Sequence, residues 1–243
     1  MILALGVGYL LALAQGVLIR PPLVIGQDAV PPAGHGMNAS STLENEGGAF
    51  INIRPAGEAT TLLIFYPGGL VRPQAYEWLG RALATDGVQT MIPVFPVDLA
   101  VTGVNRADAL ISKFGVGKRV VLAGHSLGGA MAVQYAVGRP DQIDGLILMG
   151  AYPPDNVSLR DRTLPVLTLL AGEDAVADPA NVRSGLKRLP DGARLTVIPG
   201  AVHSFFGRYG PQKEDGLPTV TRAAAELAIL GAVRDFLGGL PAR

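Results

Sequence analysis

Residues 120–129 read Val-Val-Leu-Ala-Gly-His-Ser-Leu-Gly-Gly and are the strongest local signal in the chain. Its first four residues are apolar, as in a buried strand, and apolar residues with helical spacing follow over 127–137. Between them, residues 124–128 have the form Gly-x-Ser-x-Gly, in which the serine stands on a sharp turn from strand to helix. The flanking glycines let neighbouring backbone approach closely. The stretch therefore predicts that Ser126 is a nucleophile.

The general base has to be one of three histidines. His125 adjoins Ser126 on the tight turn, where its ring cannot readily reach the serine hydroxyl, so we expect a structural role for it. His35 lies in a stretch rich in Pro and Gly near the N-terminus. His203 follows the apolar run 195–199 across a short loop, where a residue can face the carboxyl edge of a sheet. His203 is the predicted base.

A carboxylate is expected to orient the imidazole, and its place is the loop after the apolar run 165–170. That loop contains Glu173, Asp174 and Asp178. Asp178 directly precedes Pro179, a favoured first residue of a helix, so we expect it to cap that helix. Glu173 is expected to be solvated. Asp174, which ends the turn directly after the strand, is therefore the predicted acid.

A tetrahedral oxyanion needs two backbone N–H donors, one after the nucleophile and one from a loop after an earlier strand. Leu127 supplies the first. The second is expected in residues 66–70, Tyr-Pro-Gly-Gly-Leu, where Pro67 has no N–H and either Gly68 or Gly69 lets the backbone approach the substrate. Of the two glycines, we expect Gly68 to be the donor.

Strand-like apolar runs alternate with segments of helical spacing along the chain. This alternation predicts one α/β domain with a mostly parallel, doubly wound sheet and helices on both faces. Ligands of such sheets bind beyond the carboxyl ends of the strands. The expected strands are 49–54, 60–66, 88–95, 119–124, 144–150, 165–170 and 195–199, and the expected helices are 73–85, 105–114, 127–137, 179–189 and 220–237.

The composition of the chain excludes some kinds of nucleophile and metal site. The chain has 243 residues, 20 basic and 20 acidic side chains and no cysteine. A net charge of zero gives no indication of a nucleic-acid partner, and without cysteine there is neither a thiol nucleophile nor a thiolate metal site. No phosphate-binding glycine loop and no metal-spaced cluster of His and carboxylates is apparent, so we expect no metal and no cofactor. The oligomeric state is left open.

The N-terminus carries an apolar segment. Residues 1–19 contain no charged side chain and are long enough to span a bilayer, so segment 1–20 is expected to be a membrane anchor or a cleaved export signal; a buried apolar element of the domain is the third alternative. Segment 21–48 is expected to be an irregular lead-in, and 49–243 the catalytic domain. The expected location is membrane-anchored or exported.

With these residues in place, the chain resembles the single-domain α/β-hydrolase family, which includes carboxylesterases and dienelactone-hydrolase-like proteins. Beside the serine turn, the resemblance is carried by 65–69 (Phe-Tyr-Pro-Gly-Gly), 104–108 (Val-Asn-Arg-Ala-Asp) and 200–212 (Gly-Ala-Val-His-Ser-Phe-Phe-Gly-Arg-Tyr-Gly-Pro-Gln). The last of these is similar to a histidine loop of a membrane-associated bacterial branch. Dienelactone hydrolases carry a cysteine nucleophile, where this chain has Ser126.

Together these features predict a serine hydrolase that cleaves small carboxylic esters or lactones through an acyl-enzyme on Ser126. Only about a dozen residues separate two expected strands between Ala151 and Pro165, so no lid domain is expected. An acyltransferase or thioesterase with the same triad is one alternative. Product analysis with alcohol acceptors would distinguish it from an ester hydrolase. A non-catalytic, membrane-tethered binding protein on the same scaffold is the other, which a fluorophosphonate probe would separate.

Overall fold

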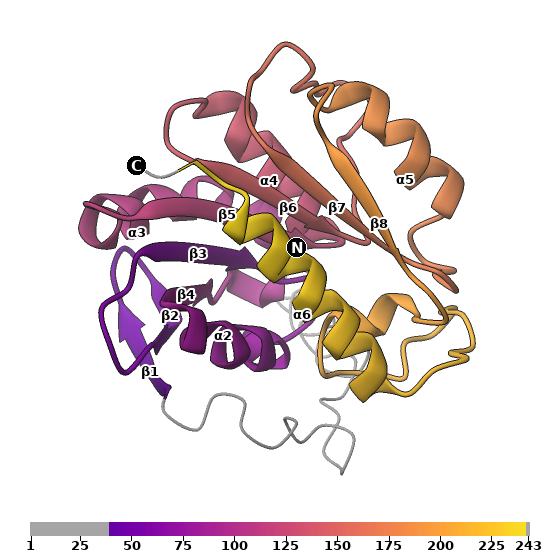
Figure 1. The fold of residues 1–243 in the computed structure, drawn as a ribbon, viewed down its shortest axis with the longest axis horizontal. Coiled ribbons are helices and arrows are strands. Elements are labelled where there is room, and N and C mark those ends of the chain that lie inside the picture. Colours follow the sequence, from indigo (N-terminus) through magenta and orange to yellow (C-terminus); the bar gives the residue numbers. More distant parts are fainter. Residues whose placement is uncertain (1–38, 242–243) are drawn as a thin grey trace, which may run out of the picture.

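Apolar runs form the central strands of an eight-stranded sheet in the computed structural model, which describes residues 39–241 (Figure 1). The strand order is β1-β2-β4-β3-β5-β6-β7-β8, and all strands from β4 to β8 in that order run parallel. The bounds are β1 (Ser40–Asn45), β2 (Ala49–Arg54), β3 (Thr61–Tyr66), β4 (Val88–Pro93), β5 (Arg119–His125), β6 (Gly145–Met149), β7 (Val166–Ala171) and β8 (Arg194–Ile198).

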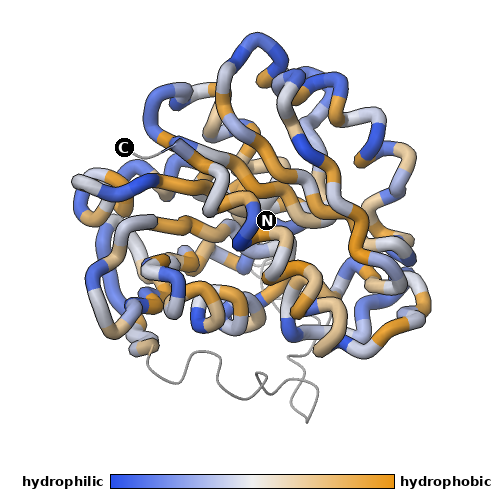
Figure 2. Tube along the Cα trace, in the orientation of Figure 1, coloured by the Kyte–Doolittle hydropathy of each residue, from blue (hydrophilic) through white to orange (hydrophobic). Residues whose placement is uncertain are grey.

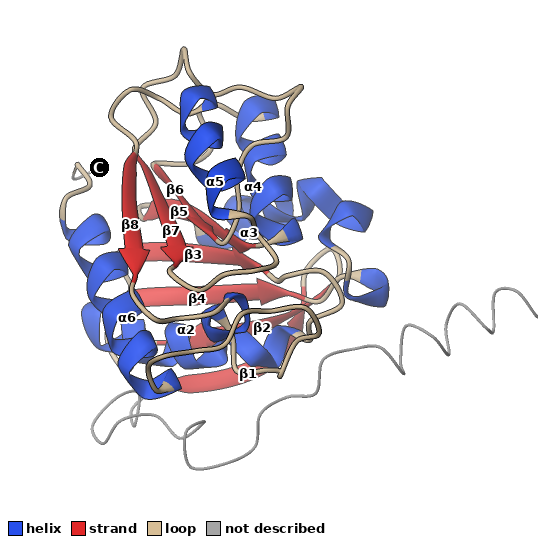
Figure 3. Ribbon diagram, turned by 90° about the vertical axis from the view of Figure 1, so that its right-hand side faces the viewer, coloured by secondary structure: helices blue, strands red, loops and turns tan. Residues whose placement is uncertain are grey.

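Helices cover both faces of this sheet, as Figure 3 shows from the side. Helices α2 and α6 pack on one face, and α3, α4 and α5 lie on the other. The bounds are α2 (Glu77–Leu83), α3 (Ala107–Phe114), α4 (Leu127–Gly138), α5 (Pro179–Gly185) and α6 (Arg222–Gly238). The predicted α/β class, a mostly parallel sheet with helices on both faces, is confirmed.

The core follows the alternation of side chains along each strand. In β3 every residue is buried, with Leu63 and Phe65 packed among residues of α2 and α6, whereas Leu62 and Ile64 pack toward α3 and α4. A strand covered on both faces needs a continuous apolar run. Figure 2 shows this as apolar colour running through the middle of the sheet.

One expectation about the chain start is wrong. Segment 21–48 was expected to be irregular, but β1 lies within it and pairs antiparallel with β2 from Ser40 opposite Arg54 to Asn45 opposite Ala49. Gly47 and Gly48 both have positive φ and form the turn between the two strands. The folded part of the chain therefore begins before Ala49.

The apolar segment 1–20 lies outside the described residues, so the expected anchor or signal stays a prediction. Within residues 39–241, no helix is both long enough and apolar enough to cross a membrane. Residues 150–165, which link β6 to β7, contain neither helix nor strand. The site at the carboxyl ends of these strands thus has no inserted lid domain at this point of the chain.

Candidate active site

Ser126 occupies the turn between β5, which ends at His125, and α4, which begins at Leu127. Its backbone has φ 52° and ψ −124°, a conformation that non-glycine residues rarely adopt and that costs free energy. The Ser126 N–H donates to the carbonyl of Met149 at the end of β6, at 3.0 Å. The neighbouring strand therefore holds the serine in this strained conformation.

Two of the flanking glycines are required by close backbone contacts. A Cβ placed on Gly124 would lie 2.5 Å from the Gly128 carbonyl, and one on Gly128 would lie 2.2 Å from the Tyr66 carbonyl oxygen. A side chain at residue 124 would force the end of β5 away from the start of α4, and one at residue 128 would push the turn away from β3. The Gly-x-Ser-x-Gly pattern is thus explained by packing around the turn.

His203 begins a short 3₁₀ turn, His203–Phe206, after β8. Its Nδ1 lies 2.8 Å from Oδ2 of Asp174, and both side chains are buried, with 1% and 0% of their surface exposed. Asp174 follows β7, and its other carboxylate oxygen accepts the N–H groups of Val176 and Ala177 at 2.9 and 2.7 Å. The acid is therefore held on one oxygen and directed at the imidazole with the other.

The structure places His203 close to the serine turn. The ring centroids of His203 and His125 are 4.4 Å apart, and Gly150, which follows the hydrogen-bond partner of Ser126, touches the His203 ring. Within residues 39–241 the Ser126 hydroxyl makes no hydrogen bond to this ring; such contacts often tighten only with substrate bound. The three predicted residues thus gather at one edge of the sheet.

The two other carboxylates of the acid loop behave as expected. Asp178 caps α5 by accepting the Ala180 N–H at 2.7 Å, and Pro179 is the first residue of that helix. Glu173 is exposed. Of the three carboxylates, Asp174 alone contacts the imidazole of His203.

His125 is turned away from Ser126. Its Nδ1 lies 2.8 Å from the Tyr76 hydroxyl, and its ring is completely buried among Tyr76, Phe206 and Tyr209. Burial, and after it the neighbouring His203, lower the pKa of His125 well below its usual value. His125 is therefore a neutral, structural residue, as its position in the sequence indicates.

In the loop after β3, the N–H group expected to be the second oxyanion donor is already hydrogen-bonded within the protein. The Gly68 N–H, the expected donor, donates to the Tyr76 hydroxyl at 3.0 Å and is buried. Within residues 39–241, the N–H groups of Gly69 and Leu127 have no acceptor, and these residues are neighbours: a Cβ on Gly69 would lie 3.2 Å from Cδ2 of Leu127. Gly69 and Leu127 thus each carry an unbonded donor beside Ser126.

Sequence reasoning missed Tyr76. Its hydroxyl joins the Gly68 N–H to His125, and burial raises the pKa of Tyr76 above its usual value, so the phenol stays protonated. No motif marks this tyrosine. The available signal was a polar aromatic residue in a stretch of otherwise helical, apolar spacing after the glycine loop.

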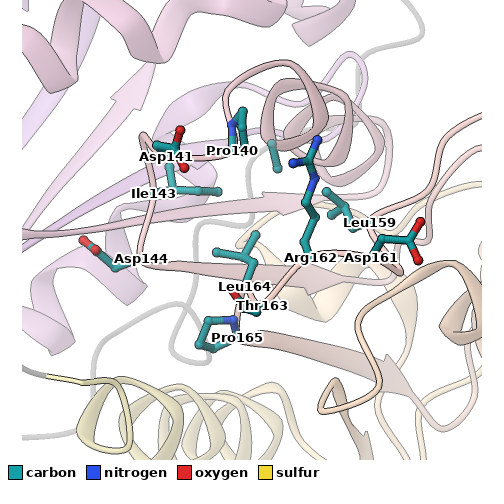
Figure 4. Close-up of a pocket in the computed structure, with 11 residues that line it drawn as sticks. Pro140, Asp141, Ile143, Asp144, Leu159, Asp161, Arg162, Thr163, Leu164 and Pro165 are labelled. Carbon is teal, nitrogen blue, oxygen red and sulfur yellow. The ribbon is translucent and has the colours of Figure 1, made fainter.

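A pocket of about 320 Å³ lies elsewhere, and Figure 4 shows its lining. Asp144 and Pro165, which directly precede β6 and β7, form part of its wall together with Asp141, Asp161 and Arg162. These positions are at the amino ends of the strands, whereas Ser126 follows the carboxyl end of β5. The pocket is therefore separate from the serine site.

Known structures have the same architecture. A predicted CIB-like hydrolase from Thermoplasma acidophilum is 15% identical, covers 82% of this chain and 98% of its own, and superposes with a TM-score of 0.65. A dienelactone hydrolase from Anabaena variabilis is 18% identical over 85% of this chain and 99% of its own, with a TM-score of 0.63. Est1E from Butyrivibrio proteoclasticus is 14% identical over 83% and 99%, with a TM-score of 0.60.

At such identities these likenesses show the fold alone. The family is shown by sequence, because the model of the alpha/beta hydrolase family matches residues 62–226, from β3 into α6. The matched range includes the serine turn, the acid loop and the histidine loop. This chain therefore belongs to the alpha/beta hydrolase family.

Proposed function

We propose that this protein is a serine hydrolase that cleaves small carboxylic esters or lactones through an acyl-enzyme on Ser126. The observation that carries the proposal is the buried contact of 2.8 Å between His203 and Asp174, next to a serine held at φ 52°. A nucleophile, a base and a group that orients the base are what covalent acyl transfer needs. A purely structural role gives no reason for a strained serine at this place.

In the proposed reaction, the Ser126 hydroxyl oxygen attacks the ester carbonyl while His203 takes its proton. Asp174 accepts the Nδ1–H of His203 and stabilises the imidazolium that forms. Collapse of the tetrahedral intermediate breaks the bond to the alcohol, which receives the proton from His203. Water then attacks the acyl-enzyme with His203 again as the base, and the acid is released with Ser126 restored.

For the oxyanion we propose Gly69 and Leu127 as donors, in place of Gly68 and Leu127. The Gly68 N–H is already bonded to Tyr76, whereas Gly69 lies against the side chain of Leu127, and the amides of both have no acceptor within residues 39–241. A donor stabilises the transition state only if it points at the place where the negative charge develops. Gly68 then serves to fix the loop through Tyr76.

The proposed substrates are small, because residues 150–165 form a short irregular connection and no lid builds a long apolar tunnel there. The similar structures include a dienelactone hydrolase and a protein named Est1E, and both names fit a carboxylic ester or lactone as substrate class. We expect turnover to be highest for short acyl chains and to fall as the chain lengthens.

The test is to measure hydrolysis of p-nitrophenyl esters from acetate to long-chain acyl groups, together with labelling by a fluorophosphonate probe. Ser126→Ala should abolish labelling and lower turnover by several orders of magnitude, about 10³–10⁶. Ser184→Ala is the matched control, because Ser184 is exposed on α5 and its hydroxyl bonds only to the Asn181 carbonyl.

Wild-type turnover in the purified Ser126→Ala variant would refute the assignment of the nucleophile. A wild-type protein that is folded but neither labelled nor active would refute the hydrolase function and favour the binding-protein alternative. An optimum at long acyl chains would refute the proposed substrate size.

A further inference from the structure

The segment that carries His203 has little regular structure of its own. After the four-residue turn His203–Phe206, neither helix nor strand follows until α6 begins at Arg222. Such a turn is too short to hold its own first amides, which have no partner within the turn. The position of the His203 backbone therefore depends on groups from elsewhere in the chain.

Asp215 supplies the acceptors for these amides. Its Oδ1 accepts the His203 N–H at 3.0 Å, and its Oδ2 accepts the Ser204 N–H at 2.8 Å. Oδ1 also accepts the N–H of Gly216, at 2.9 Å. Hydrogen bonds to a charged acceptor are stronger than those between neutral groups. One carboxylate thus binds the backbone at His203 from twelve residues further along the chain.

The carbonyl groups of the same loop face the opposite charge. The buried guanidinium of Arg222 donates to the carbonyls of Ser204 at 3.1 Å and Tyr209 at 2.9 Å, and also to that of Gly207. The amides at the start of the loop donate to the carboxylate of Asp215, and the carbonyls further along accept from the guanidinium of Arg222. The loop is therefore fixed by two charged side chains.

The residue after Asp215 ties this loop to the acid loop. A Cβ on Gly216 would lie only 1.8 Å from the carbonyl oxygen of Glu173, so the two backbones are in direct contact. The Glu173 N–H in turn donates to the carbonyl of Ala201, at 2.8 Å. Asp174, which contacts His203, is the next residue. Asp215 and Gly216 thus stand where the loops of the base and the acid meet.

We propose that Asp215 is a positioning residue that holds the His203 backbone so that the imidazole stays on Asp174 and faces Ser126. The inference rests on the proposed function, in which His203 is the base. Asp215 does not touch the reacting atoms and acts through His203 alone. A small displacement of a base can cost about 10²-fold in rate, so loss of this carboxylate should act on turnover rather than on substrate binding.

Two variants of Asp215 test this. Asp215→Ala removes all three bonds. Asp215→Asn keeps an oxygen for the His203 and Gly216 amides and places an NH₂ group, a donor, opposite the Ser204 N–H. With p-nitrophenyl acetate, we expect kcat to fall roughly 10–100-fold in the alanine variant, with KM nearly unchanged, and asparagine to restore part of the loss. The rate of fluorophosphonate labelling should fall in parallel.

Asp178→Ala is the matched control, because it removes a carboxylate that also binds a backbone N–H in a neighbouring loop, without contact to His203. It should lower the melting temperature and leave kcat unchanged. All rates are taken well below the melting temperature of each variant. If Asp215→Ala kept wild-type kcat, or if its loss in kcat were matched by Asp178→Ala, the positioning role would be refuted.

A second readout does not depend on turnover. The Nδ1 proton of His203, shared with Asp174, should give a low-field proton NMR signal, assigned by its loss in His203→Asn. We expect this signal to broaden or disappear in Asp215→Ala, to return in part in Asp215→Asn, and to persist in Asp178→Ala. An inactive wild-type protein would refute the proposed hydrolase function, whereas an unchanged signal in Asp215→Ala would refute the role of Asp215.

Discussion

Gly150 lies against the imidazole of His203, so closely that a Cβ at residue 150 would stand 2.9 Å from Nδ1. The same Cβ would lie 3.2 Å from Oδ2 of Asp174. The backbone at Gly150 also has a φ of 51°, which L side chains adopt only with strain. A glycine directly after β6 therefore makes room for the contact between base and acid.

We expect Gly150→Ala to lower both stability and turnover. The methyl group should push His203 off Asp174, and alanine at positive φ costs more than about 1 kcal/mol. Gly231→Ala in the exposed face of α6 is the control, because a Cβ there meets nothing within 4 Å and alanine favours the helix. The measurements are kcat and the urea midpoint. Full activity in Gly150→Ala would show that the His203 ring tolerates displacement.

Tyr76→Phe tests the loop that carries the proposed oxyanion donor. Removing the hydroxyl leaves the buried Gly68 N–H and Nδ1 of His125 without a partner, at a cost of about 1–3 kcal/mol for each group. Because Gly69 follows in the loop, kcat should also fall, by about tenfold, less than the 10²–10³ expected for removal of a donor.

The control for this change is Tyr66→Phe. The Tyr66 hydroxyl is also largely buried and also makes two hydrogen bonds, to the Val104 carbonyl and from the Ala107 N–H, but it faces away from His125. Tyr66→Phe should lower stability by a similar amount and leave kcat unchanged. Equal losses of kcat in the two variants would argue against a particular role for Tyr76.

The strands of the core could be predicted because burial on both faces demands continuous apolar runs. β1 could not, since it is an edge strand in which Ser40, Thr42 and Leu43 are exposed to solvent. Its pairing with β2 depends on backbone hydrogen bonds and on the contact between Glu44 and Arg54, which leave no apolar pattern in the sequence. The pair Gly47-Gly48 was the remaining signal of a hairpin.

In the candidate site, too, some features could be predicted from the sequence and others could not. That Ser126, Asp174 and His203 lie at one edge of the sheet could be predicted, because each follows the carboxyl end of a strand; their catalytic roles stay a prediction. The choice between Gly68 and Gly69 could not be made, because it depends on the hydrogen bond that the Gly68 N–H donates to Tyr76, a residue that carries no motif. Local patterns predict what a loop contains, whereas the direction of its N–H groups is decided by tertiary contacts.

His125 should make stability depend on pH. Its pKa is lowered in the folded protein by burial, so below about pH 6.5 the unfolded chain binds a proton that the native protein does not. Stability should therefore fall as pH drops from about 7.5 to about 5, with a contribution from this group of up to about 1.4 kcal/mol per pH unit.

His125→Asn isolates this effect, because the amide oxygen can still accept from Tyr76 while the titrating ring is removed. The free energy of unfolding, measured by urea titration between about pH 5 and 7.5, should depend less on pH in the variant than in the wild type. The variant and the wild type share all other titratable groups, so the difference between them reports the change at residue 125. An equal pH dependence would mean that His125 is protonated in the native protein.

The last prediction separates the three carboxylates of the acid loop. Asp174→Asn should lower turnover by about 10⁴ and leave KM nearly unchanged. The one amide oxygen stays on the N–H groups of Val176 and Ala177, so a neutral NH₂ group faces His203 and no negative charge stabilises the imidazolium. Asp178→Ala should cost about 1 kcal/mol of stability through the lost helix cap, with full activity. Glu173→Gln should show neither effect, because this side chain is exposed.

Turnover and thermal midpoint are to be measured side by side for the three variants. Near-normal turnover in Asp174→Asn, with a large loss at Glu173 or Asp178, would assign the acid to another residue of the loop.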